Sequence, residues 1–211
     1  MGFQRKKDLG SHLFGENNYM KIVSLLPSST EIVCKFGFRE QLVGVSHECD
    51  YPVSVKNLPI LTKPRFSPVE SSHEIDNSVQ NLLKKGLSVY EVNIDLLKEL
   101  APDLIITQAQ CEACAVSLND VKEAVSDWVG NKPDIISLEP NCLEEVWSDF
   151  ESVGKALNNL ESYFNLKFEI EQRLVTLKEN SQKLGKMPTV LCVEWIDPLM
   201  IAANWVPELV N

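Results

Sequence analysis

Short β-branched runs alternate with longer stretches of helical periodicity along most of the chain. Ile, Val and Leu make up most of the runs at residues 22–26 and 135–138, and the segments that follow space their apolar residues mostly by three or four. This alternation predicts an α/β fold, a Rossmann-like lobe with a parallel sheet. The predicted strands are 22–26, 42–45, 104–107 and 135–138, and the predicted helices are 30–36, 116–129 and 143–157.

Two segments lack this regular pattern. Residues 1–19 are polar, aperiodic and contain glycine, so we expect a flexible extension. Residues 52–68 contain four prolines and no sustained periodicity. This composition predicts a long loop rather than a strand–helix unit, and long loops on rigid scaffolds often carry function.

A single long helix is predicted between residues 158 and 187. Its apolar residues recur mostly at intervals of three or four, and at about 1.5 Å per residue it would span on the order of 40 Å. The apolar run 190–193 then begins another strand. Because one strand cannot bury both of its faces, we expect a second α/β lobe that is incomplete in this chain. The predicted divisions are the extension 1–19, the N-terminal α/β lobe 20–157, the spine helix 158–187 and the start of a truncated C-terminal lobe 188–211.

Composition and charge narrow the classes of function. The chain has 211 residues, of which 44% are hydrophobic and 24% charged, so it is expected to fold around a core. Its net charge of -10 repels polyphosphates, which argues against nucleic acid as a partner. No apolar stretch approaches the roughly 20 residues needed to span a bilayer. Since no export signal is visible, a cytoplasmic protein is expected, or a periplasmic or cell-surface one if an upstream signal is missing.

Polar and aromatic residues collect just after the predicted strands, where an open parallel sheet binds ligands. Ser28, Ser29 and Thr30 could cap the first helix or hold an anion at its N-terminus. His47 and Glu48 could act as an acid and base or form hydrogen bonds in a cleft, and no nucleophile motif accompanies them. The predicted ligand-binding residues are Ser28, Ser29, Thr30, His47, Glu48, Asp50, Tyr51, Glu139, Glu194, Trp195 and Trp205.

The aromatic residues fall into two groups by their positions in the predicted elements. Tyr51, Trp195 and Trp205 lie in loop or edge positions, where a flat ring can cover one face of a large planar ligand, although each could equally pack in a core. Trp128 and Trp147 have helical spacing and apolar neighbours, which favours core positions.

The six cysteines leave three interpretations open. Cys111 and Cys114 have the spacing of metal and redox sites, and Cys49 and His47 are the candidates for two further metal ligands. The same residues could instead be reduced thiols packed beneath a loop. Cys34, Cys142 and Cys192 lie in or beside apolar segments and are expected to be buried.

Taken together, the motifs resemble those of the cobalamin-binding proteins among the substrate-binding proteins of ABC transporters. This family is periplasmic-binding-protein-like and has a helical backbone. The segments that carry the resemblance are 22–31 (IVSLLPSSTE), 44–52 (GVSHECDYP), 72–76 (SHEID), 107–117 (TQAQCEACAVS), 137–140 (SLEP), 194–199 (EWIDPL) and 204–208 (NWVPE).

The resemblance implies a receptor that holds cobalamin or a related corrinoid between two lobes and delivers it to the membrane subunits of an ABC-type importer. It implies no enzymatic activity and no cofactor other than cobalamin as the ligand. The loop around Asp50 and Tyr51 would face the corrin from the first lobe, and Trp195 and Trp205 from the second. The alternatives are a haem, siderophore or metal-ion receptor of the same fold, and a cytoplasmic zinc or thiol-redox protein that uses Cys111 and Cys114.

Overall fold

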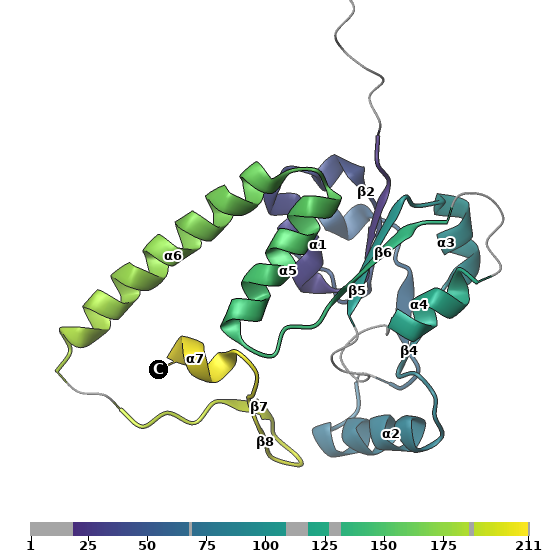
Figure 1. Ribbon diagram of the computed structural model, residues 1–211. Coiled ribbons are helices and arrows are strands. Elements are labelled where there is room, and N and C mark those ends of the chain that lie inside the picture. The colour runs from purple at the N-terminus through teal and green to yellow at the C-terminus, as the bar shows by residue number, and fades with distance from the viewer. Residues whose placement is uncertain (1–18, 68, 109–117, 127–131, 186–187, 211) are drawn as a thin grey trace, which may run out of the picture.

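The centre of the molecule is a four-stranded parallel sheet of order β2-β1-β5-β6. The computed structural model describes residues 19–67, 69–108, 118–126, 132–185 and 188–210 (Figure 1). All of the predicted strands of the first lobe are present, and the parallel pairing confirms the predicted α/β fold. The strands are β1 (Ile22–Ser24), β2 (Leu42–Val45), β5 (Leu104–Gln108) and β6 (Asp134–Leu138).

Helices cover both faces of this sheet and bury it completely at its centre. Ile22 and Ile106 point to the side of α1 (Pro27–Lys35) and α5 (Leu143–Ala156), where they join one apolar cluster. Their neighbours in sequence point the other way, because successive side chains of a strand alternate between faces. Burial on both faces explains why these strands are continuous apolar runs. The second apolar cluster contains Val23 and Ile105 and packs against α3 (Ile94–Leu100) and α4 (Leu118–Ala124).

The region between β2 and β5 contains more regular structure than predicted. The predicted loop at 52–68 is wrong, because it contains a short 3-10 turn, Val53–Asn57, and the strand β3 (Thr62–Pro64). β3 pairs antiparallel with β4 (Tyr90–Val92), and Ile60, two residues before β3, bridges to Val45 of the edge strand β2. Proline is tolerated in such an edge position, so its presence did not exclude a strand.

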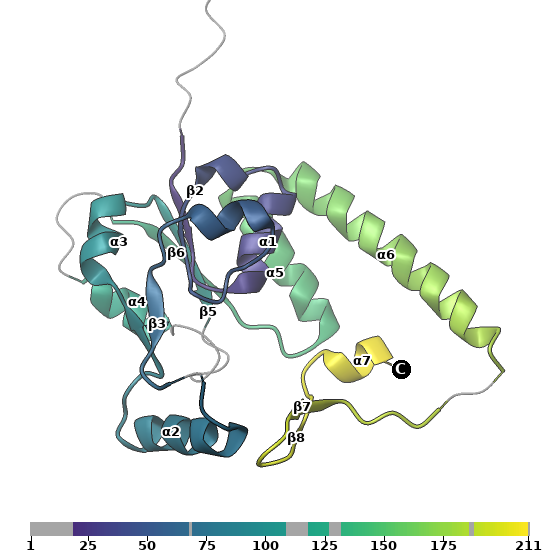
Figure 2. The same cartoon turned by 180° about the vertical axis from the view of Figure 1, so that it is seen from behind.

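Helix α2 (Ser72–Lys84) was also absent from the prediction. It begins with a capping box, in which the Ser71 hydroxyl accepts from the Glu74 backbone N–H and the Glu74 carboxylate accepts from the Ser71 N–H. None of its residues is buried, and it lies as a separate element below β4 in Figure 1 and below β3 in Figure 2. The capping box was the local signal that could have identified this helix.

The predicted long helix is confirmed as α6 (Leu160–Gln182), which is 23 residues long and unbroken. Asn159 caps its N-terminus by accepting a hydrogen bond from the Ser162 N–H. Its first turns pack on the lobe through Tyr163, which is buried, and Leu166. Beyond Leu174 every described residue of the helix is exposed, so its second half projects away from the lobe (Figures 1 and 2).

After α6 the chain returns toward the first lobe (Figure 2). The strand predicted at 190–193 is misplaced, since β7 (Val193–Trp195) begins where that run ends. β7 forms an antiparallel hairpin with β8 (Met200–Ile201), and the short helix α7 (Val206–Val210) follows. No described residue between 188 and 210 is buried. In both views this segment lies beneath α5 and beside α2.

Candidate ligand-binding site

The carboxyl ends of the parallel strands meet at the edge of the sheet that faces α2 and the β7–β8 hairpin (Figures 1 and 2). Loops after the strands of a parallel sheet converge at this edge, which is why the sequence order could identify it. His47 and Glu48 follow β2, and Glu139 follows β6. The predicted residues of the first lobe therefore come from the correct ends of the strands.

His47 is the most constrained side chain at this edge. Its Nδ1 atom lies 2.7 Å from Thr62 Oγ1, and its backbone N–H donates to the same oxygen at 3.0 Å. Its ring also packs against Tyr90 with 5.3 Å between the ring centroids. Burial lowers the pKa of His47, and the nearby Glu48 carboxylate opposes that shift. The imidazole is thus held in one orientation and favours its neutral form.

Glu48 covers the other nitrogen of the His47 ring. Glu48 Oε1 lies 3.1 Å from His47 Nε2, while the carboxylate side chain is 57% exposed. This contact has the distance of an ion pair but not the alignment of a hydrogen bond. Nε2 is buried and makes no hydrogen bond to another described residue. The same carboxylate adds to burial in raising the pKa of Tyr90.

Ser29 and Thr30 lie inside the lobe rather than on a binding surface. Both are fully buried, and the Thr30 hydroxyl lies 2.8 Å from Ser24 Oγ and 3.1 Å from Cys49 Sγ. The Ser29 hydroxyl donates to the Leu26 carbonyl at 3.1 Å. These contacts give them a structural role, joining β1, α1 and the loop after β2.

The predicted capping role of this triplet is wrong. Helix α1 begins at Pro27, whose fixed φ angle and missing N–H suit the first helical position, and its N-cap is Leu26. Ser29 and Thr30 therefore lie within the first turn, where their hydroxyls bond back to the Leu26 carbonyl. Ser28 is exposed beside them.

The loop residues Asp50 and Tyr51 are both exposed at the end of the segment that follows β2. Tyr51 exposes 55% of its surface, so its ring is free to contact a ligand. Tyr51 therefore does not pack in the core, which was the alternative to a ligand-binding role.

Glu139 is exposed at the end of β6 and belongs to an acidic group at the start of α5. Its backbone N–H donates to Asp149, a residue that sequence reasoning did not single out. Burial raises the pKa of Asp149 to about 6, the hydrogen bond from Glu139 opposes that shift, and the carboxylates of Glu139 and Glu145 add to it.

The second part of the predicted site contacts α2 directly. The Trp195 indole Nε1–H donates to the Ser72 carbonyl at 3.3 Å and to the Asp197 carbonyl at 3.0 Å. Asp197 Oδ1 also lies 3.6 Å from His73 Nδ1, at the beginning of α2. These contacts bring the β7–β8 hairpin against the first lobe.

The remaining predicted residues of this part lie close by in the chain. Glu194 is exposed in β7, and Trp205 is half-buried just before α7. Glu208 of α7 accepts a hydrogen bond at 3.4 Å from the Leu143 backbone N–H at the start of α5. The segment after α6 therefore contacts two different helices of the first lobe.

The proposed metal ligands are only partly accounted for. Cys111 and Cys114 lie outside the described residues. Cys49 is buried beside Thr30 and Ser46, as expected of a packed thiol. Among the described ranges, no group of three or more His, Cys, Asp or Glu side chains could hold a metal ion. Trp147 is buried as predicted, whereas Cys34, Cys142 and Cys192 are only partly buried and Trp128 is not described.

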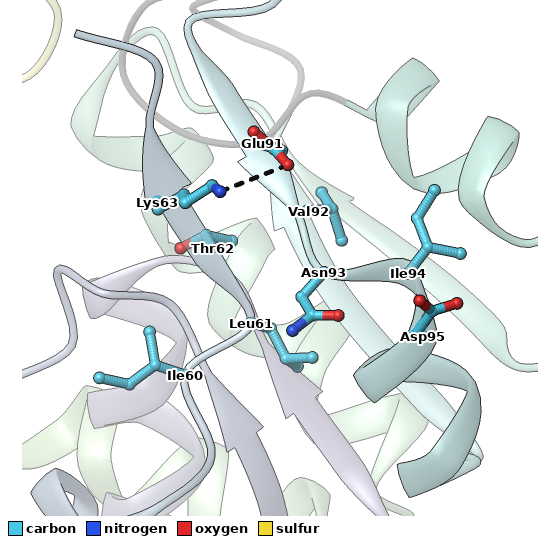
Figure 3. A pocket seen from close by; sticks show the side chains of 9 residues that line it. All are labelled: Ile60, Leu61, Thr62, Lys63, Glu91, Val92, Asn93, Ile94 and Asp95. Atoms are coloured by element: carbon cyan, nitrogen blue, oxygen red, sulfur yellow. Dashed lines mark ion pairs between the residues drawn. The ribbon is translucent and has the colours of Figure 1, made fainter.

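Two cavities of similar size are present, and Thr62, which contacts His47, lines the first of them. One of about 540 Å³ lies along β3, β4 and the start of α3, where Lys63 and Glu91 form an ion pair of 3.5 Å (Figure 3). None of the predicted ligand-binding residues that the structure describes lines it. The other, of about 530 Å³, lies between the end of α6 and the segment 188–210 and is lined mainly by apolar side chains. Neither is the site indicated by the sequence.

Thr62, Tyr90, Ser72 and His73 were missed as candidates for the site. Thr62 and Tyr90 reach His47 only because β3 and β4 pair with each other and extend from the sheet edge. That pairing has no local signature in the sequence. The segment containing Ser72 and His73 carried part of the family resemblance, and the capping box marked the start of its helix.

Comparison with known proteins connects this architecture to solute receptors. The profile of a family described as "Periplasmic binding protein" matches residues 22–206. A periplasmic vitamin B12 binding protein of Vibrio cholerae has a similar structure, with a TM-score of 0.61 and 20% identity over 90% of this chain and 63% of that chain. An ABC transporter substrate-binding protein from Listeria monocytogenes EGD-e gives a TM-score of 0.60 and 16% identity over 90% and 62% of the two chains.

A third similar structure is the apo form of a periplasmic heme-binding protein from Roseiflexus sp. RS-1. Its TM-score is 0.58 and its identity 22%, over 82% of this chain and 54% of that chain. The chain thus spans between 54% and 63% of the length of these solved structures. No curated protein matches the sequence.

The family consists of solute-binding proteins rather than enzymes. Its description does not support the cytoplasmic location expected from the sequence. Within the part of the chain that the structure describes, no helix has both the length and the apolar character of a membrane span. The family profile covers most of the chain, and the parallel sheet with its long helix agrees with the fold of the similar structures. The chain belongs to the periplasmic binding protein family.

Proposed function

We propose that this protein binds cobalamin or a related corrinoid between its first lobe and the segment that follows α6, and delivers it to an ABC-type importer. The observation that carries the proposal is the placement of Trp195. It lies on the segment beyond α6, yet its indole contacts the start of α2 on the first lobe. A long helix that leads to such a contact suits a receptor whose ligand is enclosed from two sides.

The chemistry of the strand ends suits a large, flat ligand with polar edges. The exposed Tyr51 ring offers an apolar face, and Asp50, Glu48 and Glu139 offer hydrogen-bond acceptors for amide groups. Corrinoids carry such amide side chains around their ring. The resemblance in fold to the vitamin B12 binding protein of Vibrio cholerae supports this ligand class.

A haem receptor is the second candidate. Heme-binding proteins from Roseiflexus and Pseudomonas aeruginosa have similar folds, each with a TM-score of 0.58, close to that of the vitamin B12 binding protein. Haem is also a flat macrocycle, but it carries carboxylates, which the acidic strand ends would repel at neutral pH. This difference in charge favours the corrinoid.

Both candidates place the protein outside the cytoplasmic membrane, beside the importer that receives the ligand. The ligand is the only non-protein group that the proposal requires. The net charge of -10 argues against nucleic acid as a partner.

Parallel titrations test the proposal. Cyanocobalamin, haemin and a ferric siderophore are added separately to the full-length protein, and binding is followed by calorimetry and absorbance. We expect saturable binding of cyanocobalamin, reduced at least tenfold by Tyr51→Ala. Binding of haemin alone would favour the second candidate, and no response to any of the three at high micromolar concentration would contradict both.

A further inference from the structure

The β7–β8 hairpin contacts α2 through the polar edge of the Trp195 ring. The indole Nε1–H donates to the Ser72 carbonyl at 3.3 Å and to the Asp197 carbonyl at 3.0 Å. An indole has a single donor, so two acceptors of the protein share this N–H. At hydrogen-bond distance no ligand atom fits between the indole nitrogen and the Ser72 carbonyl. A ligand therefore reaches the space between this edge of Trp195 and α2 only when the contact opens.

An ion pair closes the same point. Asp197 Oδ1 lies 3.6 Å from His73 Nδ1, and His73 follows Ser72 in the first turn of α2. The hydrogen bond and the ion pair thus join the same two short stretches, residues 195–197 and residues 72–73. We call these two interactions together the hairpin–α2 contact.

The segment 188–210 is held to the first lobe at a second point. Glu208 of α7 accepts a hydrogen bond at 3.4 Å from the Leu143 N–H of α5, whose N-cap residue Cys142 supplies no side-chain cap. The carboxyl edge of the sheet faces α2 and the hairpin, so the segment lies across the approach to the candidate site (Figures 1 and 2). A single long hydrogen bond is the weaker attachment, which leaves the hairpin–α2 contact as the main closure.

The hairpin–α2 contact can open without disturbing a core. No residue of α2 is buried, and no described residue between 188 and 210 is buried. An exposed ion pair and a shared hydrogen bond each stabilise a structure only slightly, because water replaces them when they break. Interactions of this strength suit a contact that opens and closes repeatedly.

We propose that the hairpin–α2 contact is autoinhibitory, keeping the candidate site closed to its ligand until the hairpin leaves α2. The inference rests on the proposed function and concerns how the ligand enters that site. If only molecules with an open contact bind, the apparent dissociation constant is the intrinsic one divided by the open fraction. Weakening the contact therefore tightens binding, whereas removing an ordinary ligand contact weakens it.

Stopped-flow absorbance with cyanocobalamin tests the proposal, with haemin as the probe if haemin is the ligand that the wild-type protein binds. His73→Ala removes the ion pair and lies outside the predicted ligand-binding residues. We expect it to raise the association rate constant about two- to fivefold, with the dissociation rate constant unchanged. Trp195→Phe keeps an aromatic ring but removes the N–H, and should raise the association rate constant about three- to tenfold.

The matched control is Ile196→Ala, which alters the residue between Trp195 and Asp197. Its side chain takes no part in the hairpin–α2 contact and the residue is 77% exposed, so the association rate constant should equal that of the wild type. Urea unfolding shows whether each variant folds. His73 has a side chain that is 62% exposed, so its replacement keeps the fold and the test remains valid even if Trp195→Phe is destabilised.

The possible outcomes separate the two proposals. Association rate constants equal to the wild-type value in His73→Ala and Trp195→Phe, with ligand bound, would overturn the autoinhibitory contact and leave the proposed function standing. Faster dissociation and weaker binding in His73→Ala would show that the contact closes over the bound ligand, which also overturns it. If neither cyanocobalamin nor haemin binds the wild-type protein, both proposals fail.

Discussion

The first lobe and the segment 188–210 differ in the interactions that stabilise them. In the lobe, the central strands are buried on both faces, and residues such as Ile105 and Ile106 have no exposed surface. In the segment, no described residue is buried, and hydrophobic side chains including Ile196 and Ile201 are largely exposed. Stability therefore resides in the lobe, whereas the segment is placed by polar contacts with α2 and α5. The difference fits a receptor with one rigid part and one adjustable part.

The largest expected effect compares two isoleucines in strands. Ile105→Ala in β5 should lower the free energy of unfolding by about 4 kcal/mol, because it leaves a cavity in the core. Ile201→Ala in β8, where the side chain is 62% exposed, should change it by less than about 0.5 kcal/mol. Urea unfolding measures both. Similar losses at the two positions would show that the segment contributes to the same core.

The next effect concerns two adjacent aromatic residues of α6. Tyr163→Ala should lower the free energy of unfolding by about 3 kcal/mol, since this ring is buried and anchors the helix to the lobe. Phe164→Ala should lower it by about 1 kcal/mol or less, because the residue is 60% exposed, although its ring centroid lies 4.9 Å from that of Tyr163. The same denaturation assay applies. A larger loss for Phe164→Ala would mean that α6 packs on its other face.

A pH-dependent effect is expected at Asp149 of α5, which lies near Glu139 and Glu145. Its pKa is raised from 3.8 to about 6, so folding favours the protonated acid. This contribution is complete below about pH 4 and is lost as the pH rises through 6. Because the carboxyl is only half-buried, solvent screening leaves roughly 1 kcal/mol of the penalty.

The variant Asp149→Asn should therefore stabilise the protein by about 1 kcal/mol at pH 8 and have little effect at pH 4. Glu144→Gln, an exposed position in the same helix, is the control for the loss of one negative charge. Unfolding in urea at both pH values measures the difference. A gain at pH 4 that disappears at pH 8 would contradict the direction of the pKa shift.

The smallest effect is expected for the ion pair between His73 and Asp197. Both side chains are more than 60% exposed, so a double-mutant cycle with His73→Gln and Asp197→Asn should give a coupling of about 0.2–1 kcal/mol. Glu194→Gln, another exposed acid of the segment, serves as the control. A coupling above about 2 kcal/mol would show that the hairpin is fixed firmly on α2. The segment 188–210 would then not be more adjustable than the first lobe.

The sequence predicted elements best where burial dictates the pattern. β2 was predicted with its observed bounds and α5 to within one residue, because their apolar positions are those that pack in the lobe. α6 was predicted to within a few residues, although only its first turns pack on the lobe. α2 was missed because it buries no residue, and β3 because its Pro64 resembled a loop signal. Elements without a buried face leave only capping and turn signals in the sequence.

The candidate site was predictable only in part for a similar reason. Strand order placed His47 and Glu48 at the carboxyl edge, since that edge follows from parallel pairing alone. The partners of His47 lie on β3 and β4. These strands pair with each other only in the folded protein, so Thr62 and Tyr90 could not be identified from the sequence. Ser29 and Thr30 were predicted to cap the first helix or to bind ligand. The helix instead begins at Pro27, which places both residues, buried, within its first turn.

Hydrogen–deuterium exchange with and without cyanocobalamin tests most directly whether one ligand contacts both parts. The account predicts that the ligand slows exchange in two separate regions, residues 46–52 of the first lobe and residues 193–199 of the hairpin. Protection confined to one of these regions, or found instead along the cavity at β3 and β4, would contradict a site enclosed from two sides.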